Sequence, residues 1–320
     1  MKKQFKILST VDLTDCIDGI SELEQIGDLT CMEPSREKVL NKIHIFDAYI
    51  ASASILVDGE FIDKAKNLKI IGSPSTGTDH LSIEAIQKRN ITLFDISKEF
   101  DLINSFTATS ELAFGLTISL IRKLMPAINS AKKGDWAREK YTGFQLSNKT
   151  LGIIGLGRLG TISAKIGQGF GMKIIAHDIV NKNVNNVTMM TFEQVLRLSD
   201  IITVHIHLNN STKGLINKNC FSLMKQNSIL INTSRGAIID ENSLLEALKN
   251  GYIAGAGLDM IEGEWLKQSD IYNHPLIEYS RQNNNLIITP HIGGSSKESI
   301  SGARNFMTKK VASWLANNSL

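Results

Sequence analysis

The sequence predicts an α/β protein of two lobes, each built around a parallel sheet. The chain has 320 residues, which exceeds the size at which a single hydrophobic core usually keeps growing. Short apolar runs alternate with amphipathic stretches over the first hundred or so residues, and the alternation starts again at Thr150. Few hairpin signals separate these runs, so we expect Rossmann-like or flavodoxin-like sheets covered by helices on both faces.

Four apolar runs in the first lobe have the length of strands, at residues 5–8, 47–51, 69–72 and 91–96. Beyond them Leu112, Leu116, Leu120 and Leu124 recur every four residues, and Pro126 follows closely. This spacing predicts a packed helix that ends before the proline and covers residues 111–125.

Six apolar runs predict the strands of the second lobe, at residues 151–154, 173–177, 201–206, 228–232, 253–259 and 286–289. We expect a helix from Asp240 to Asn250, because Asp240 is a good N-cap and Gly251 follows the last helical position. Residues 297–317 predict a final amphipathic helix with four apolar contacts, Phe306, Val311, Trp314 and Leu315.

Composition and charge narrow the class of protein. Hydrophobic residues make up 42% and charged residues 21%, which is ordinary for a soluble globular protein. The formal net charge of +3 includes no basic run that could follow a nucleic-acid backbone. Asp12 and Asp15 interrupt any apolar stretch behind the basic N-terminus, so we expect no secretory signal, no membrane contact and a cytoplasmic location. The three cysteines are far apart, which indicates reduced packing thiols: Cys16, Cys31 and Cys220.

The motif GLGRLG directly follows the first strand of the second lobe and predicts a dinucleotide site. Gly155 would permit a tight turn, Gly157 would let the main chain approach a pyrophosphate, and Gly160 would let the helix pack on its strand. The phosphates would lie at the helix N-terminus, where unpaired N–H groups and the helix dipole favour an anion. Asp178 ends the next strand and would bind a ribose, which favours NAD over NADP, although Lys182 could soften the repulsion of a 2′-phosphate.

Three polar residues follow the ends of three later strands, where ligands of an open parallel sheet gather. These residues are Arg235, Glu264 and His291. A guanidinium can hold a carboxylate with two hydrogen bonds, and an imidazole can transfer a proton near neutral pH. A carboxylate beside the imidazole would favour its protonated form, as the reduction of a carbonyl requires.

With these residues in place, the chain resembles the D-isomer-specific 2-hydroxyacid dehydrogenases, the family of phosphoglycerate, glycerate and D-lactate dehydrogenases. The resemblance covers nearly the whole chain. It is carried by five segments, at residues 73–80 (SPSTGTDH), 155–160 (GLGRLG), 232–236 (NTSRG), 257–264 (GLDMIEGE) and 289–294 (TPHIGG).

The resemblance implies a role for each member of the trio. Arg235 would bind the substrate carboxylate and carbonyl, His291 would be the acid/base, and Glu264 would hydrogen-bond His291 and raise its proton affinity. The substrate carboxylate would also be held by the loop of Ser75, Thr76 and Gly77. The implied cofactor is NAD, with Asp259 at the nicotinamide amide, and its contacts are Thr109, Gly155, Gly157, Arg158, Leu159, Gly160, Asp178, Thr233, Asp259, Gly293 and Gly294.

The family fold further implies a substrate domain of residues 1–104 and 295–320, with an NAD-binding domain of residues 105–294 inserted into it. It also implies a homodimer, for which residues 134–138 resemble the dimer arm. The sequence departs from the family at two positions, where Trp265 and His207 replace frequent prolines. We expect the first to reshape the pocket wall and the second to alter a loop that lines the cofactor.

The substrate stays open at this level. Related enzymes often carry arginine at the position of Ser73, and residues 51–54 carry no cation either, so an unphosphorylated small 2-keto acid is favoured. D-3-phosphoglycerate dehydrogenase remains an alternative, since Lys88, Arg89 or a second subunit could supply positive charge. A second alternative is an NADH-sensing binding protein like the co-repressors that resemble this family. His205 and His207 could face one side of a strand, but no further ligand completes a metal site, so none is expected.

Overall fold

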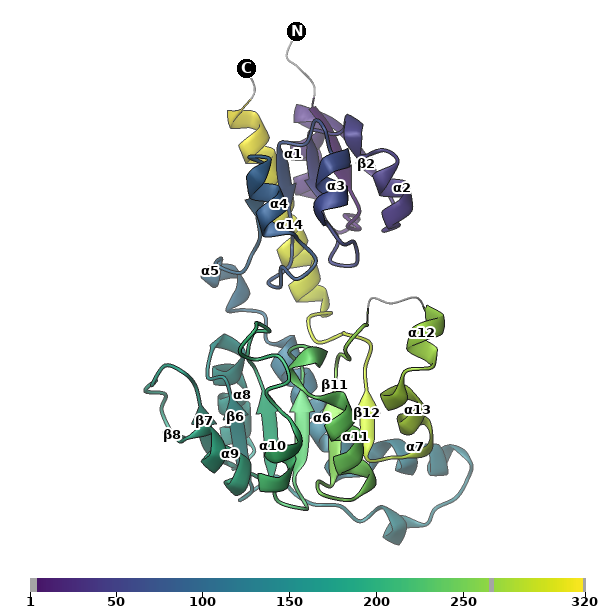
Figure 1. The fold of residues 1–320 in the computed structure, drawn as a ribbon, viewed down its shortest axis with the longest axis vertical. Coiled ribbons are helices and arrows are strands. Elements are labelled where there is room, and N and C mark those ends of the chain that lie inside the picture. The colour runs from purple at the N-terminus through teal and green to yellow at the C-terminus, as the bar shows by residue number, and fades with distance from the viewer. Residues whose placement is uncertain (1–4, 265–267, 319–320) are drawn as a thin grey trace. The chain divides into compact units, whose positions relative to one another are not determined.

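The computed structural model describes residues 5–264 and 268–318, and the chain divides into two compact units. The first unit comprises Met1–Phe106 and Ser296–Leu320, and the second comprises Thr107–Ser295 (Figure 1). Within the described ranges, no helix combines the length and the apolar character needed to cross a bilayer.

The first unit is built on a five-stranded sheet of order β2-β1-β3-β4-β5. Every neighbouring pair is parallel, which is the flavodoxin-like arrangement that the alternating sequence pattern predicted. The strand β2 was not predicted, because it lies at the edge of the sheet and three of its five residues, Asp28, Thr30 and Cys31, are exposed. The strands are β1 Phe5–Ser9, β2 Gly27–Cys31, β3 Ala48–Ile50, β4 Ile70–Gly72 and β5 Thr92–Phe94.

The C-terminal helix belongs to this first unit although 189 residues of the second unit precede it (Figure 1). It packs against α1 and β4, and its Val311 and Leu315 are buried as the apolar pattern predicted. Phe306 and Trp314 are only partly buried at the margin of the same core. The helices of the unit are α1 Ile17–Ile26, α2 Arg36–Leu40, η1 Ile43–Ile45, α3 Gly59–Lys64, α4 Ile83–Lys88, α5 Phe100–Ile103 and α14 Lys297–Asn317.

The second unit is built on a seven-stranded parallel sheet of order β12-β11-β10-β9-β6-β7-β8. The chain starts in the middle at β6, winds outward through β7 and β8, and then crosses to β9 and winds to the other edge. This is the doubly wound order, whose direction reverses between β6 and β9, and ligands of such sheets bind at the carboxyl edge there. The strands are β6 Thr150–Ile154, β7 Lys173–His177, β8 Val187–Met189, β9 Ile201–Val204, β10 Ile229–Asn232, β11 Gly255–Leu258 and β12 Leu286–Ile288.

Helices pack against this sheet: α6 contacts β10 and β11, and α8 and α9 contact β6 and β7. The helix α11 begins as expected, because the Asp240 carboxylate accepts a hydrogen bond from the Ser243 N–H at 2.8 Å. The helices are α6 Ala108–Ile121, α7 Leu124–Lys132, η2 Arg138–Tyr141, α8 Arg158–Gly169, α9 Phe192–Leu198, α10 Lys218–Leu223, η3 Gly236–Ile238, α11 Glu241–Lys249, α12 Gln268–Tyr272 and α13 Pro275–Gln282.

Three predicted elements need correction. The helix expected over residues 111–125 starts earlier and breaks at Lys123, whose left-handed φ of 51° separates α6 from α7. Pro126 therefore lies in the first turn of α7, where a proline costs no hydrogen bond. The strand β9 ends at Val204, before His205 and His207, and β11 is shorter at both ends than its apolar run. Cys31 is exposed, so only Cys16 and Cys220 are packing thiols.

Candidate active site

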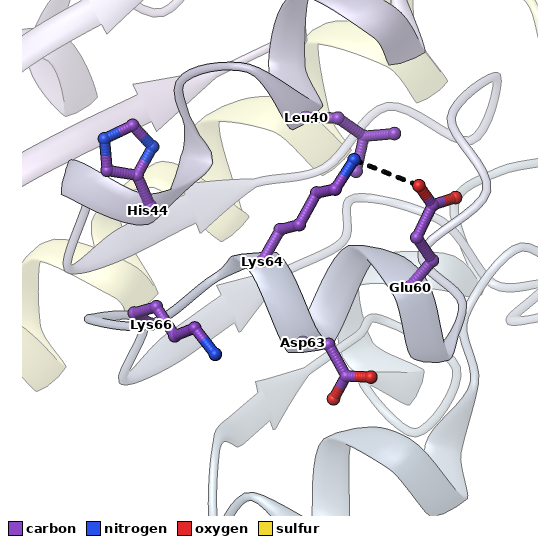
Figure 2. Close-up of a pocket in the computed structure, with 6 residues that line it drawn as sticks. All are labelled: Leu40, His44, Glu60, Asp63, Lys64 and Lys66. Carbon is purple, nitrogen blue, oxygen red and sulfur yellow. Dashed lines mark hydrogen bonds and ion pairs between the residues drawn. The ribbon is translucent and has the colours of Figure 1, made fainter.

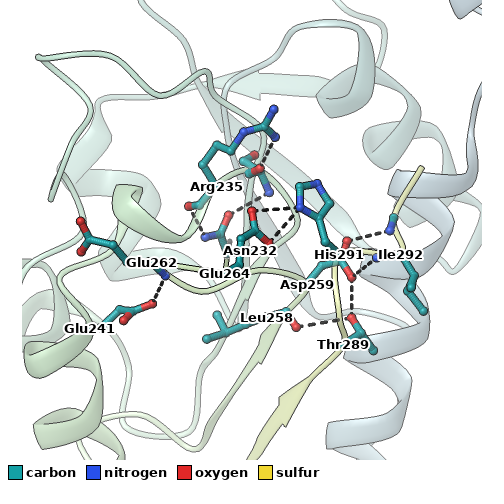
Figure 3. A network of polar contacts seen from close by, with 12 residues as sticks. Asn232, Arg235, Glu241, Leu258, Asp259, Glu262, Glu264, Thr289, His291 and Ile292 are labelled. Carbon is teal, nitrogen blue, oxygen red and sulfur yellow. Dashed lines mark hydrogen bonds and ion pairs between the residues drawn. The ribbon is translucent and has the colours of Figure 1, made fainter. Parts of the chain in front are cut away.

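The loops that follow β10, β11 and β12 carry Arg235, Glu264 and His291, all within the second unit. Main-chain hydrogen bonds join these loops beyond the last paired residues of the strands. The Asp259 N–H donates to the Asn232 carbonyl at 2.9 Å, and the His291 N–H donates to the Asp259 carbonyl at 2.7 Å. The strands β10, β11 and β12, which precede these three loops, are therefore adjacent in the sheet. Figure 3 shows Arg235, Glu264 and His291 in one polar network.

His291 and Glu264 are in direct hydrogen-bond contact in the structure. Nδ1 of His291 lies 3.0 and 2.9 Å from the two carboxylate oxygens of Glu264. Because the carboxylate accepts, it fixes Nδ1 as the donor, and Nε2 is then the nitrogen that exchanges a proton. The Glu264 side chain is 16% exposed and the His291 side chain 32%, so the pair is shielded but not sealed.

Asp259 holds the turn that carries His291. Its side chain is completely buried, and its oxygens accept hydrogen bonds from the Thr289 hydroxyl at 2.6 Å and from the N–H groups of Ile292 and Gly293 at 2.9 and 2.7 Å. A carboxylate has about four acceptor positions, so most are already used within the chain. The sequence suggested only a cofactor contact for Asp259, and this positioning contribution was missed.

The Arg235 loop is organised by two polar residues that precede it. The buried Asn232 side chain donates to the Arg235 carbonyl at 2.8 Å and accepts from the Ser234 N–H at 3.0 Å. The Ser234 hydroxyl donates to the Val204 carbonyl at 2.7 Å, which ties the loop to β9. Asn and Ser favour such side-chain turns, so the NTSRG segment itself contained the signal for both residues.

The glycine motif forms the turn from β6 into α8. Gly155 has φ of 92°, and a Cβ there would lie 2.4 Å from the His205 carbonyl oxygen. A Cβ on Gly160 would lie 2.1 Å from the Gly155 oxygen, so the helix packs directly on the turn. At Gly157, by contrast, a Cβ would meet no atom within 4 Å. The open space thus lies at the glycine where a pyrophosphate would approach the main chain, with Arg158 and Leu159 in the first turn of the helix.

Asp178 follows β7 and is already paired. Its Oδ2 accepts from the Leu156 N–H at 2.8 Å and from Lys182 Nζ at 2.9 Å, and its Oδ1 accepts from the Val180 N–H. Burial raises the pKa of Asp178, but the hydrogen bonds from Val180 and Lys182, the Lys182 charge and the Leu156 N–H together hold it below the usual value. Lys182 therefore sits directly at the predicted ribose position.

Further residues support a dinucleotide at this edge of the sheet. Among the described residues, the hydroxyl of Thr233 is buried and has no hydrogen-bond partner, as expected of a group that faces a ligand. A Cβ on Gly293 would lie 3.2 Å from Thr109 Cγ2 and 2.8 Å from Asp259 Oδ2, so these three predicted contacts lie together. Gly294 is exposed beside them. The residues present thus fit the cofactor that the sequence implied.

The predicted substrate loop belongs to the first unit and follows β4. Ser75 accepts a main-chain hydrogen bond from Ile96, while the neighbouring Thr76 is exposed and Gly77 partly exposed. Ser73 is completely buried, and its hydroxyl lies 3.2 Å from His80 Nε2. Its side chain is therefore packed inside the protein and is not exposed to a ligand. The absence of arginine at position 73 says less about the substrate than the sequence suggested.

The two departures from the family pattern have different outcomes. Trp265 lies outside the described residues. His207 is exposed, and its carbonyl accepts a hydrogen bond from the Thr212 hydroxyl at 2.7 Å, so the loop closes through the main chain. The ring of His205 bonds to the hydroxyls of Ser163 and Thr203, and no group of three potential metal ligands occurs among the described residues.

A surface hollow in the first unit is separate from all of these residues. Figure 2 shows its lining, which comprises Leu40, His44, Glu60, Asp63, Lys64 and Lys66. Glu60 pairs with Lys64 at 3.0 Å and with Arg36 at 3.1 Å, in partly exposed contacts that contribute little energy. None of the predicted site residues lines this hollow.

The fold and the site define a dinucleotide-dependent oxidoreductase, and comparisons with known proteins agree. Residues 114–293 match the NAD binding domain of the D-isomer specific 2-hydroxyacid dehydrogenases. The chain is 34% identical over 309 residues to a glyoxylate reductase of Thermococcus litoralis, covering 92% of this chain and 89% of the relative. It is also 34% identical over 298 residues to D-3-phosphoglycerate dehydrogenase of Bacillus subtilis, covering 92% of this chain but only 54% of the relative.

A solved structure shares the whole architecture. The D-lactate dehydrogenase of Aquifex aeolicus, complexed with NAD and lactic acid, matches with a TM-score of 0.85 and 26% identity over 98% of this chain and 96% of that chain. The chain belongs to the D-isomer specific 2-hydroxyacid dehydrogenases. The predicted fold class, the NAD cofactor and NAD-dependent oxidoreduction of hydroxy acids are thereby confirmed.

Proposed function

We propose that this enzyme interconverts a small, unphosphorylated 2-keto acid and the corresponding D-2-hydroxy acid. The observation that carries the proposal is the His291–Glu264 pair, held by the buried Asp259 on the strand end next to the Arg235 loop. The first unit would bind substrate and the second unit would bind the cofactor.

Each residue has a distinct part in this reaction. Arg235 would hold the substrate carboxylate and polarise the carbonyl through its planar guanidinium. His291 would deliver a proton from Nε2 to the oxygen formed at C2, and Glu264 would orient the ring and balance its charge. By the family resemblance, the main chain at Thr76 and Gly77 would also contribute to binding the substrate carboxylate. Bound NADH supplies the hydride.

Two observations favour an unphosphorylated substrate. Arg89, one of the cations that could have met a phosphate, donates instead to the carbonyls of Ile62 and Lys66. The loop of Ser75, Thr76 and Gly77 offers hydroxyls and main chain but no cation. The relative from Thermococcus litoralis, named a glyoxylate reductase, supports the same class. Glyoxylate and hydroxypyruvate are the substrates that we test first, and phosphohydroxypyruvate represents the alternative.

The first experiment measures NADH oxidation with glyoxylate, hydroxypyruvate, pyruvate and phosphohydroxypyruvate, for the natural protein and for His291→Ala. We expect turnover with an unphosphorylated acid, and a loss of kcat of roughly 10²- to 10⁴-fold in the variant, which is the usual weight of a general acid. NADH binding, followed by fluorescence, should stay nearly unchanged. Unchanged turnover in His291→Ala would refute the acid/base assignment.

The same panel separates the alternatives. Preference for phosphohydroxypyruvate would favour a phosphoglycerate dehydrogenase, and tight NADH binding without any turnover would favour a sensor.

We also propose a cytoplasmic homodimer. The segment 134–138, which resembles the family's dimer arm, exposes Trp136 to 84%, and a dimer could bury this side chain. Light scattering of the purified protein measures that state.

A further inference from the structure

A second pair of titratable residues, Glu241 and His274, contacts the loop that carries Glu264. Glu241 is the first residue of α11, and its Oε1 accepts a hydrogen bond from the Glu262 N–H at 2.7 Å. Its Oε2 lies 3.1 Å from His274 Nε2. The Glu241 side chain is 16% exposed and the His274 side chain 13%, so their contact is partly buried. The Glu262 N–H that Glu241 accepts from is two residues before Glu264. Figure 3 shows the bond between Glu241 and Glu262 to the left of Glu264 and His291.

The protonation of His274 follows from its other nitrogen. Nδ1 accepts a hydrogen bond from the Leu276 N–H at 3.3 Å and thereby caps α13. The proton of the neutral ring is therefore on Nε2, which faces Glu241. The Glu262 N–H donates to Oε1 of Glu241, and the ring N–H of His274 lies on the nitrogen 3.1 Å from Oε2, so each oxygen of the ionised carboxylate has an N–H group nearby. Protonation of Glu241 removes one of the two acceptors.

The Arg235 loop also lies against this peptide. A Cβ on Gly236 would lie 2.2 Å from the carbonyl carbon of Ile261 and 2.4 Å from the nitrogen of Glu262. The main chain of the Glu264 loop thus touches the residue that follows Arg235. Gly236 and Glu241 thus both contact the Glu262 peptide, and His274 contacts Glu241 in turn.

We propose that Glu241 is a positioning residue: its ionised carboxylate fixes the Glu262 peptide and so holds Glu264 in register with His291 and the Arg235 loop. This inference rests on the proposed function of Glu264 and His291. It adds a residue that does not touch substrate, and it makes the geometry of the catalytic pair depend on a proton bound elsewhere.

Burial and neighbouring charges place the titration of Glu241 near neutral pH. Burial raises the pKa of Glu241 to about 7, against the Glu262 N–H bond, and the negative charges of Glu262 and Asp240 act in the same direction as burial. Burial lowers the pKa of His274, against a hydrogen bond to the Glu262 backbone and the charge of Glu262. Lys213 lies 3.7 Å from the Glu262 carboxylate and partly offsets its charge. A hollow of about 250 Å³ lined by Glu241 and His274 gives protons access from solvent.

The test compares kcat for keto-acid reduction by the natural protein and by Glu241→Gln between pH 5.5 and 8.5. Glutamine offers one acceptor oxygen, like protonated glutamate. Above pH 8 we expect the variant to be slower by about three- to tenfold, the weight of one hydrogen bond. Below pH 6 the two proteins should converge. Glu246→Gln is the matched control, because Glu246 lies on the same helix in an exposed ion pair with Lys218.

A purely structural contribution of Glu241 would lower kcat by the same factor at every pH, and such a constant ratio, or superimposed profiles, would overturn the proposal. If Glu241→Gln does not fold, His274→Asn retains a capping side chain and should give the same convergence. Nitrogen NMR of the histidine rings in the natural protein needs no turnover. We expect the His291 signals to show an inflection at the pH where Glu241 titrates, and its absence would contradict the coupling. A protein without turnover that still shows this inflection would refute the proposed function alone.

Discussion

The backbone of His291 has φ of 54°, a left-handed conformation that costs a residue with a side chain roughly 1–2 kcal/mol. The hydrogen bonds from Thr289, Ile292 and Gly293 to the buried Asp259 over-determine the turn and can offset that cost. In this conformation the His291 imidazole lies within hydrogen-bond distance of Glu264. At the scale of single residues, the site is thus set by main-chain geometry around one carboxylate.

Arg235 provides a test at the same scale. Replacement by lysine keeps the charge but removes the planar pair of donors, so kcat/KM for the keto acid should fall by about 10- to 100-fold, mostly through KM. The KM for NADH should change little. Steady-state kinetics with both substrates varied measures this result. Arg197→Lys, in an exposed pair with Glu193 on α9, is the control and should behave like the natural protein.

The turn between β6 and α8 shows how one element separates folding from binding. Gly155 and Gly157 lie two residues apart, yet only the first lacks room for a side chain. Gly157 has φ of −76°, which any residue can adopt, and open space around it. The element therefore needs Gly155 for its own shape, while Gly157 is needed only if a ligand approaches.

Two alanine variants test this distinction. Gly155→Ala should destabilise the protein by about 1–3 kcal/mol or more, because the methyl group meets the His205 carbonyl at a positive φ. Gly157→Ala should leave the free energy of unfolding within about 0.5 kcal/mol but weaken NADH binding. Urea unfolding and fluorescence titration measure the two effects. Equal NADH affinity in Gly157→Ala and the natural protein would place the pyrophosphate elsewhere.

For the molecule as a whole, the partly buried His205 and Glu241 side chains affect stability with opposite pH dependence. Burial lowers the pKa of His205 to about 4, so its stabilising contribution is full above pH 6.5 and is lost as the pH falls through 4. Linkage puts this loss at about 2 kcal/mol between pH 7 and pH 5. The raised pKa of Glu241 has the opposite sign, because its contribution is full below pH 4.5 and is lost as the pH rises through 7.

We therefore expect the stability of the natural protein to change little between pH 7 and pH 5. His205→Gln removes one of the two opposing groups, so on acidification it should gain about 2 kcal/mol relative to the natural protein. Urea unfolding at the two pH values measures this difference. His207→Gln changes an exposed histidine two residues away and should follow the natural protein. If His205→Gln does the same, the ring of His205 is not desolvated in solution.

The sequence by itself determined the parallel α/β architecture, the turn at Gly155 and the positions of Arg235, Glu264 and His291 past strand ends. These features depend on local patterns, because apolar periodicity and turn residues act over a few positions. Edge strands such as β2 carry too little apolar pattern to be found in this way, and the break at Lys123 lies inside a continuous helical pattern.

Only the tertiary structure decided which carboxylates hold which loops. The sequence predicts a cofactor contact for Asp259 and indicates no role for Glu241 or His274. Asp259 and Glu241 accept hydrogen bonds from N–H groups 21 to 34 residues away in the sequence. The burial of Ser73 against His80 likewise depends on the fold, and the sequence could indicate only that related enzymes often carry arginine there. Hydrogen bonds between distant loops depend on strand order and helix packing, and no short stretch of sequence encodes either.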